Sequence, residues 1–218
     1  CVGAGHATLA NEGSVSTAPK SYITPEEYLE AERRAPFRSE YFAGEVFAMA
    51  GASYVHALLV RNLILSLQPR LGLRGCNAVA NDIRVQVAGT GLYTYPDIVV
   101  ICGKPQFVDH VHDMLTNPSL IAEVLSPSTE AYDRGRKFDH YQTISSLRQY
   151  VLVASDRVHI DVYTRQPNGD WLLSNATGPE GVVTLLDGCE LRLADAYADV
   201  DLSSVETGWK PLGGASDR

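Results

Sequence analysis

The pattern of hydrophobic and polar positions changes several times along the 218 residues, and each change predicts a different element. From about Ser53, leucines recur at steps of four, which is typical of a helix that packs one face against a core. These leucines are Leu59, Leu63, Leu67 and Leu71. Residues 77–87 instead alternate strictly, which predicts one half-buried strand with Val85 on its apolar side and Arg84 on its polar side.

Two elements are predicted before the long helix. The segment TPEEYLEAERR predicts a short surface helix, because Thr24 suits the N-cap, Pro25 the first helical position and Glu27 a capping box with Thr24. In SEYFAGEVFAMAG, two arms rich in aromatic and β-branched residues surround Ala43 and Gly44. This second pattern predicts a hairpin or a bent strand.

Short apolar runs predict the strands of the remaining chain. YPDIVVIC and the IAEVL of residues 121–125 suit buried strands, and residues 104–118 between them are expected to form a loop. A helix of about three turns is expected after the second run. Further strands are predicted in LRQYVLVAS, RVHIDVYTR, WLLSN and GVVTLL. This order of elements predicts an α/β or α+β sheet domain.

Composition sets the expected domain boundaries. Residues 1–20 are small and polar without periodicity, which predicts a disordered leader, and residues 207–218 are expected to form a tail. The chain is 45% hydrophobic, enough for one substantial core. We therefore expect a single domain over residues 21–206.

Charge and cysteine spacing bear on partners and compartment. The formal net charge of −8 gives no general attraction to phosphate polymers, which counts against nucleic acid without excluding it. The four cysteines are widely spaced, so neither a zinc ribbon nor a disulfide framework is expected. No apolar run reaches the roughly 20 residues that span a bilayer. We expect a soluble, cytoplasmic protein with no membrane partner, and a homodimer is left open.

Glu123 is the first candidate for chemistry. It lies inside an apolar run, and burying an unpaired carboxylate costs several kcal/mol, so such a group is usually paired, neutralised or bound to a metal. Asp97 follows Pro96 at the start of another predicted buried strand. If the two strands pair, the carboxylates approach each other, and a divalent cation relieves their repulsion. Oxygen ligands favour magnesium or manganese.

Lysine and further carboxylates complete the candidate site. Asp133, Lys137 and Tyr141 are spaced four apart, so they share one face of the predicted helix and can bring an ammonium to the carboxylates. Glu45, just after the predicted turn, is a candidate for a further carboxylate.

Each of these residues also has an ordinary explanation when it is taken alone. Asp97 suits a turn, Glu123 a solvated strand face beside an arginine, and Lys137 a solvated helix position. Glu45 suits an exposed hairpin, and His56 near a helix start suits a surface or capping side chain. Only the combination favours a site.

The combination resembles the PD-(D/E)xK nuclease superfamily and, more narrowly, the Uma group of restriction-endonuclease-like proteins. The resemblance rests on EYFAGEV, YPDIVVI, EVLSPST, DRGRKFDHY and RQYVLVAS, and covers roughly residues 24–163. It implies a central mixed sheet flanked by helices and divalent-metal-dependent phosphodiester hydrolysis. The strands predicted at the C-terminal end are additions to that sheet.

The resemblance also implies roles for individual residues. Asp97 and Glu123 match the acidic pair, Glu45 matches an N-terminal glutamate, and Lys137 matches a lysine on the following helix. The superfamily's usual lysine position is Leu125 here. Ala43 departs from the family, which commonly has aspartate there.

The leading hypothesis is a Mg²⁺- or Mn²⁺-dependent DNA endonuclease. Asp97 and Glu123 would hold the metal, and Lys137 would assist the attack on phosphate. Tyr141, as a hydrogen-bond donor, and His56 would support these groups without contacting the substrate. A non-catalytic binding or regulatory protein and a hydrolase of a small phosphodiester are the alternatives. A basic groove near the site is also expected, from the cations Arg134, Arg136, Lys137, Arg148, Arg61, Arg70 and Arg74.

Overall fold

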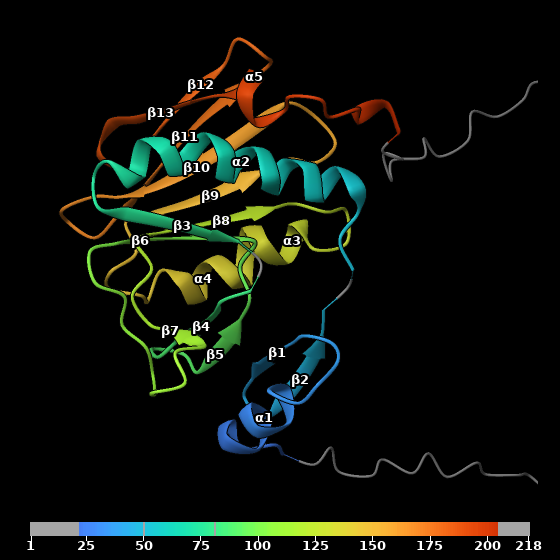
Figure 1. Cartoon of the computed structure of the whole chain (residues 1–218), viewed down its shortest axis with the longest axis vertical. Helices are drawn as coiled ribbons and strands as arrows, with labels where there is room; N and C mark the ends of the chain where they lie inside the picture. Colours follow the sequence, from blue (N-terminus) through green and yellow to red (C-terminus); the bar gives the residue numbers. More distant parts are fainter. Residues whose placement is uncertain (1–21, 50, 81, 205–218) are drawn as a thin grey trace, which may run out of the picture.

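The protein is described here from a computed structural model, which covers residues 22–49, 51–80 and 82–204 (Figure 1). The expected leader, 1–20, and tail, 207–218, lie outside the described residues, so the single domain over 21–206 stays a proposal. Within the described ranges, the chain forms two larger sheets and one two-stranded sheet, with helices packed against them. The predicted α/β class, with a mixed sheet flanked by helices, is therefore confirmed, and two further sheets accompany the largest one.

A six-stranded mixed sheet forms the centre of the molecule, in the order β11-β10-β9-β8-β6-β3. Its strands are β3 (Cys76–Ala80), β6 (Ile98–Cys102), β8 (Leu120–Val124), β9 (Gln149–Val153), β10 (His159–Arg165) and β11 (Trp171–Thr177). Strands β8 and β9 are parallel, whereas β6 and β8 are antiparallel. β6, β8 and β9 are apolar over most of their length because both faces of this sheet are covered.

The second sheet has the order β2-β1-β5-β4-β7. Its strands are β1 (Ser39–Phe42), β2 (Glu45–Ala48), β4 (Arg84–Val87), β5 (Leu92–Thr94) and β7 (Met114–Leu115). β12 (Val182–Leu185) and β13 (Cys189–Arg192) form the third, two-stranded sheet.

Helices cover both faces of the central sheet. α2 (Tyr54–Gly72) lies on one face, whereas the segment α3 (Glu130–Tyr132), η1 (Asp133–Lys137) and α4 (Phe138–Tyr141) lies on the other (Figure 1). The sheet has a hydrophobic core on each face, and alternate residues of a strand point into one core or the other. Val100 of β6 packs in the core on the α2 side, and Val99 packs in the core on the α4 side. The remaining helices are α1 (Pro25–Glu32), α5 (Leu193–Ala196), η2 (Leu186–Gly188) and η3 (Leu202–Ser204).

Local signals at the N-terminal end are confirmed in detail. Thr24 Oγ1 accepts a hydrogen bond from the Glu27 backbone amide, and the Glu27 carboxylate accepts one from the Thr24 amide, which completes the capping box. β1 and β2 form the predicted hairpin around Ala43 and Gly44. Both turn residues have positive φ, 50° and 87°, as a two-residue turn that matches the strand twist requires.

The prediction of one strand over residues 77–87 is wrong. The segment divides into β3 and β4, which belong to different sheets, because its apolar positions serve two different cores. Arg84, expected on a half-exposed face, is only 4% exposed, and its guanidinium donates to the Tyr95 hydroxyl. The predicted loop over residues 104–118 also contains the short strand β7.

No disulfide framework was expected from the cysteine spacing, but Cys76 and Cys102 are joined by a disulfide. They are 26 residues apart in sequence but directly opposite each other in the β3–β6 register. Among the described residues, no helix combines the length and apolar character needed to cross a membrane.

Candidate functional site

Two carboxylates face each other where β6 begins and β8 ends. Ile98 pairs with Ala122 and Val100 with Leu120, so the next position of this antiparallel register places Asp97 opposite Glu123. The Asp97 amide donates to Glu123 Oε2 at 3.2 Å, and the Val124 amide donates to Asp97 Oδ2 at 2.8 Å. The predicted pairing of the two acidic positions is therefore present.

Glu123 is buried among polar partners. Its side chain is only 5% exposed, and its Oε1 lies 2.9 Å from Lys137 Nζ. The same oxygen accepts a hydrogen bond of 2.9 Å from the Tyr141 hydroxyl. Glu123 is thus neither on a solvated strand face nor unpaired.

Lys137 reaches the site from the helical segment, as the spacing of four predicts. Its ammonium lies 3.4 Å from the Asp133 carboxylate one turn earlier, and Tyr141 one turn later contacts the same Glu123 oxygen. Lys137 is in η1, a π-helical turn, and such turns often occur at functional sites. The lysine is only 6% exposed, so the expectation of a solvated surface residue does not apply.

Glu40 is the site residue that the sequence analysis missed. Its carboxylate lies 3.3 Å from Lys137 Nζ and also accepts a hydrogen bond from the Thr94 hydroxyl. The signal available was an acidic residue inside the predicted hairpin, but its position relative to Lys137 depends on how the hairpin packs.

Glu45, the hairpin carboxylate that was predicted for the site, begins β2. It pairs in register with Phe42, and Glu40 pairs with Phe47, so these side chains share one face of the hairpin. Glu45 therefore lies on the same face as Glu40. Its catalytic role stays a prediction.

His56 supports Asp97 from the first turn of α2. Ser53 caps the helix by accepting from the His56 amide, and this places the imidazole 2.9 Å, Nε2 to Oδ1, from the Asp97 carboxylate. The long helix thus fixes one carboxylate of the pair, while the α3–α4 segment fixes the other.

Negative charge is in excess within this buried cluster. Lys137 is the shared partner of three carboxylates, those of Glu123, Glu40 and Asp133. The pKa of Glu123 is raised to about 8, because burial, together with the charges of Asp97 and Asp133, outweighs the opposing effect of the Lys137 ammonium. Burial by itself lowers the pKa of Lys137, but Glu123, Glu40 and Asp133 together raise it well above its usual value. The lysine is therefore charged at neutral pH, and the cluster favours a further cation.

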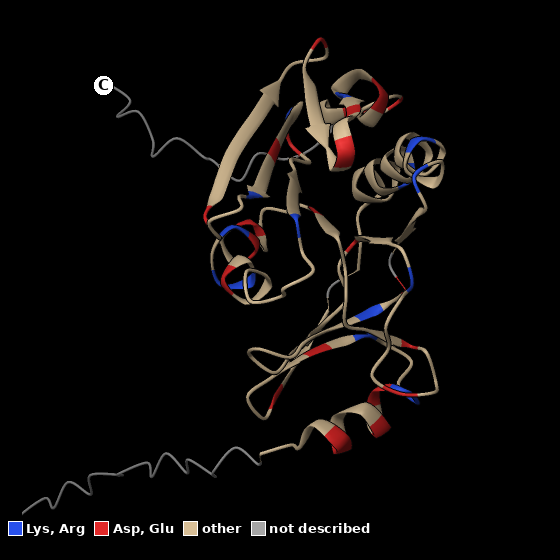
Figure 2. Ribbon diagram, turned by 90° about the vertical axis from the view of Figure 1, so that its left-hand side faces the viewer, with Lys and Arg blue, Asp and Glu red and all other residues tan. Residues whose placement is uncertain are grey.

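Three of the residues named for the expected basic groove, Arg134, Lys137 and Arg148, are paired with carboxylates. Arg134 pairs with Glu130 and Asp161, both at 2.7 Å, and Lys137 is buried. Arg148 pairs with Asp187, and its backbone amide donates to the Ser119 carbonyl. Ser119 directly precedes the first residue of β8, whereas Glu123 lies near the last, so Arg148 is at the far end of this strand from the site. Acidic and basic residues are interleaved along the ribbon in Figure 2. Arg136 remains an exposed cation next to Lys137 in sequence.

The donor set fits a hard divalent cation. Carboxylate oxygens are the ligands of Mg²⁺ and Mn²⁺, and Mg²⁺ is commonly held by one or two carboxylates together with water and substrate phosphate. Among the described residues, the only group of three close metal-ligating side chains is Cys76, Cys102 and Asp187, far along β6 from Asp97. Asp97 and Glu123 therefore suit a metal that completes its coordination with other ligands.

Facing carboxylates on antiparallel strands, with a lysine from the neighbouring helix, place this protein in the restriction-endonuclease-like class. The family comparison agrees: residues 25–196 match the Uma2 family, which is described as "Putative restriction endonuclease". The chain belongs to this family.

Two relatives from Synechocystis sp. (strain ATCC 27184 / PCC 6803 / Kazusa) extend over most of the chain. The uncharacterized protein slr1290 is 40% identical over 164 residues, which are 73% of this chain and 83% of the relative. The uncharacterized protein sll1609 is 37% identical over 161 residues, which are 74% of this chain and 91% of the relative.

A solved structure shares the fold. The crystal structure of "a putative nuclease belonging to DUF820" from Anabaena variabilis ATCC 29413 superposes with a TM-score of 0.65 at 18% identity. The match covers 80% of this chain and 97% of that one.

Proposed function

We propose that the protein is a Mg²⁺- or Mn²⁺-dependent endonuclease that hydrolyses phosphodiester bonds of DNA in the cytoplasm. The observation that carries the proposal is the buried excess of carboxylates around one lysine, beside an aspartate that faces Glu123. Membership of a family described as a restriction endonuclease supports phosphodiester hydrolysis as the reaction.

Asp97 and Glu123 would hold the metal between the ends of β6 and β8. When bound, such a cation lowers the pKa of a coordinated water and polarises the scissile phosphate. His56 fixes the orientation of Asp97 through a 2.9 Å hydrogen bond, and Tyr141 does the same for Glu123. Both carboxylates are thereby held in place before substrate arrives, which lowers the cost of organising the site.

Lys137 supplies positive charge to the phosphoryl group. Its ammonium stays protonated because Glu123, Glu40 and Asp133 surround it. A charged donor next to the metal ligands stabilises negative charge as it develops on the phosphate oxygens. Lys137 thus takes this role from the helix, because the strand position two residues after Glu123 is the buried Leu125.

The direct test is cleavage of supercoiled plasmid and linear DNA by purified protein, in Mg²⁺, in Mn²⁺ and with a chelator. We expect nicking or linearisation with a metal and none with the chelator. Asp97→Asn and Glu123→Gln should each reduce the rate by about 100-fold or more, the scale typical of losing an essential electrostatic group. The matched exposed variant Glu190→Gln should cleave at the wild-type rate.

Two results would redirect the proposal. If the wild-type protein cleaves nothing with either metal but still binds DNA, the protein is a binding module. If cleavage is confined to small phosphodiesters and is insensitive to salt, the substrate is not a polymer, because neutralising several phosphates makes binding steeply salt-dependent.

A further inference from the structure

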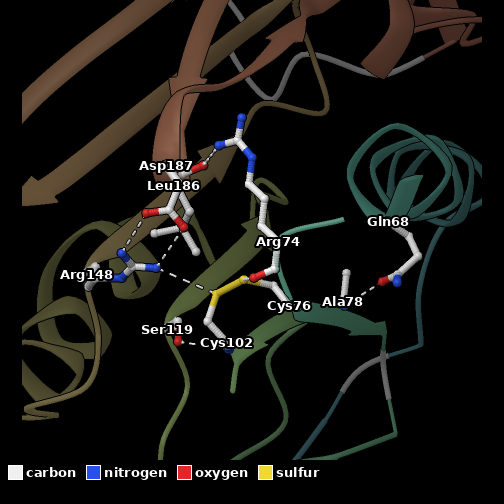
Figure 3. The surroundings of a disulfide bond; sticks show 9 residues. All are labelled: Gln68, Arg74, Cys76, Ala78, Cys102, Ser119, Arg148, Leu186 and Asp187. Atoms are coloured by element: carbon white, nitrogen blue, oxygen red, sulfur yellow. Dashed lines mark hydrogen bonds and ion pairs between the residues drawn. A yellow bond between two sulfur atoms is a disulfide. The ribbon is translucent and has the colours of Figure 1, made fainter. Parts of the chain in front are cut away.

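A second group of reactive side chains lies at the C-terminal end of β6, away from Asp97. Asp97 precedes this strand and Cys102 ends it, so the two residues are about 17 Å apart at 3.4 Å per residue. Cys102 is bonded to Cys76, the first residue of the neighbouring edge strand β3 (Figure 3). The candidate nuclease site does not use this pair.

The two sulfur atoms have different surroundings. Cys76 is only 1% exposed, and its Sγ lies 3.9 Å from the Arg74 carbonyl oxygen, an acceptor that favours a protonated thiol. Cys102 is half-buried, and Arg148 Nη2 lies 3.6 Å from its Sγ. A guanidinium beside a sulfur stabilises the thiolate, which is the reactive form of cysteine. When the pair is reduced, Cys102 is therefore the accessible nucleophile and Cys76 its protonated neighbour.

Asp187 moderates the charge on Arg148. Its carboxylate pairs with Arg148 Nη1 at 3.0 Å (Figure 3), and it approaches both sulfur atoms closely enough to form a group of three metal-ligating side chains. A soft cation such as Zn²⁺ suits thiolates, but here the Arg148 guanidinium is already paired with the Asp187 carboxylate and contacts Cys102. The arrangement therefore favours thiol–disulfide chemistry over metal binding.

We propose that Cys76 and Cys102 form a reversible thiol–disulfide site that exchanges with low-molecular-weight thiols and disulfides, with Cys102 as the point of attack. In the oxidising direction, the Cys102 thiolate attacks a small disulfide RSSR, forms Cys102–S–SR and releases RS⁻. Cys76, losing its proton to solvent, then attacks Cys102 Sγ and releases a second RS⁻. Two protein thiols are oxidised and one RSSR is reduced to two RSH.

The same pair controls how α2 and β3 are attached to β6. This segment is anchored at one end by the hydrogen bond of His56 to Asp97 and at the other by Cys76 to Cys102. Reduction removes the second anchor and leaves β3 as an edge strand without a covalent link to β6, held there by backbone hydrogen bonds and by contacts such as that of the Ala78 amide with the Gln68 side chain. Faster amide exchange in β3 is the expected consequence, because edge segments with few anchors open locally.

The test uses reduced and oxidised glutathione with the full chain in a Cys1→Ser background. In native buffer, reduced glutathione should open the disulfide, and hydrogen exchange of β3 should rise relative to β9. In variants that keep only one cysteine of the pair, oxidised glutathione should modify Cys102 in Cys76→Ser at least about 10-fold faster than Cys76 in Cys102→Ser, since only Cys102 is accessible and next to a cation. The buried Cys189 serves as an internal control.

Two matched variants test the role of charge. Arg148→Gln should slow the reaction of Cys102, whereas Asp187→Asn should accelerate it by freeing the guanidinium. Asparagine tolerates the positive φ of 55° at this position, so the second change keeps the backbone.

Three results would overturn the proposal: a disulfide that opens only in denaturant, equal modification of the two cysteines, or reduced protein that takes up zinc in competition with a chromophoric chelator and then resists glutathione. None of these readouts depends on nuclease activity.

Discussion

Replacing Glu123 by glutamine should remove a pH-dependent weakness from the fold. Burial raises the pKa of this carboxyl from 4.5 to about 8. Each pKa unit corresponds to about 1.4 kcal/mol, so ionising Glu123 in the folded protein costs about 5 kcal/mol more than in the unfolded chain, before relaxation reduces the figure.

The direction in which stability changes with pH follows from proton binding. Because the folded pKa lies above the unfolded one, the folded protein binds more protons between pH 4.5 and 8. The contribution of Glu123 to stability is therefore complete below pH 4.5 and is lost as the pH rises through 8. Glu123→Gln keeps an oxygen acceptor for the Tyr141 hydroxyl but has no charge to titrate. The difference in free energy of unfolding, variant minus wild type, should therefore increase by a few kcal/mol as the pH rises from 5 to 9.

Urea unfolding of both proteins at pH 5, 7 and 9 measures this change, with Glu190→Gln as the exposed control that should follow wild type. The difference between wild type and variant matters, since it cancels the titration of all other groups. Saturating Mg²⁺ should stabilise wild type more at pH 8 than at pH 5, because metal ligands must be deprotonated. Parallel pH profiles of wild type and Glu123→Gln would refute the reasoning, because Glu123 would then titrate like an exposed glutamate.

Three other side chains of the cluster give separable predictions. Lys137→Ala should lower kcat more than it raises KM, which plasmid-cleavage kinetics measure. The same variant should unfold more easily at pH 8 than at pH 5, because the carboxylates accept protons at the lower pH, and urea unfolding measures this. The exposed Lys104→Ala is the control for both. Lys137→Arg should not restore kcat, because a planar guanidinium does not replace a compact ammonium. Glu40→Gln should lower the pKa of Lys137, which NMR titration of the Nζ group detects as a change of at least several tenths of a pH unit. His56→Ala should weaken Mg²⁺ binding by about 10-fold in calorimetry, the lower end of the effect of losing a partner of a metal ligand, and no change would exclude His56 from orienting Asp97.

The parts of the site that sequence predicts are those set by local spacing. The four-residue step carries Asp133, Lys137 and Tyr141 to one face, and two short apolar runs with acidic residues at corresponding ends predict the Asp97–Glu123 pairing. The first inference needs only the geometry of a helix, whereas the second also assumes that the two strands pair.

The residues that were missed depend on tertiary placement. Glu40 reaches Lys137 because the β1–β2 hairpin packs beside the helical segment, and no periodicity in the hairpin distinguishes Glu40 from Glu45 as the contact. Cys76 and Cys102 meet because β3 pairs with β6, and that pairing was hidden by an alternation that continues unbroken from β3 into β4. Arg148 was assigned to the wrong end of β8 for a similar reason: charge and sequence proximity do not give direction along a sheet.

The position of the lysine on a helix has a physical consequence that a strand position would lack. A strand can offer the site only every second residue, and the residue two after Glu123 is Leu125, which packs in the apolar cluster with Tyr141 and Tyr150. The helical segment instead presents three groups at successive turns: Asp133 as a counter-charge, Lys137 as the ammonium and Tyr141 as the hydrogen-bond donor. These groups move together, so a shift of the segment would change the charge next to Glu123 and the hydrogen bond to it at the same time. The ion pair of Arg134 with Asp161 attaches this segment to β10, while its pair with Glu130 lies within the segment; the first of these therefore helps to set the geometry of Glu123 without contacting it.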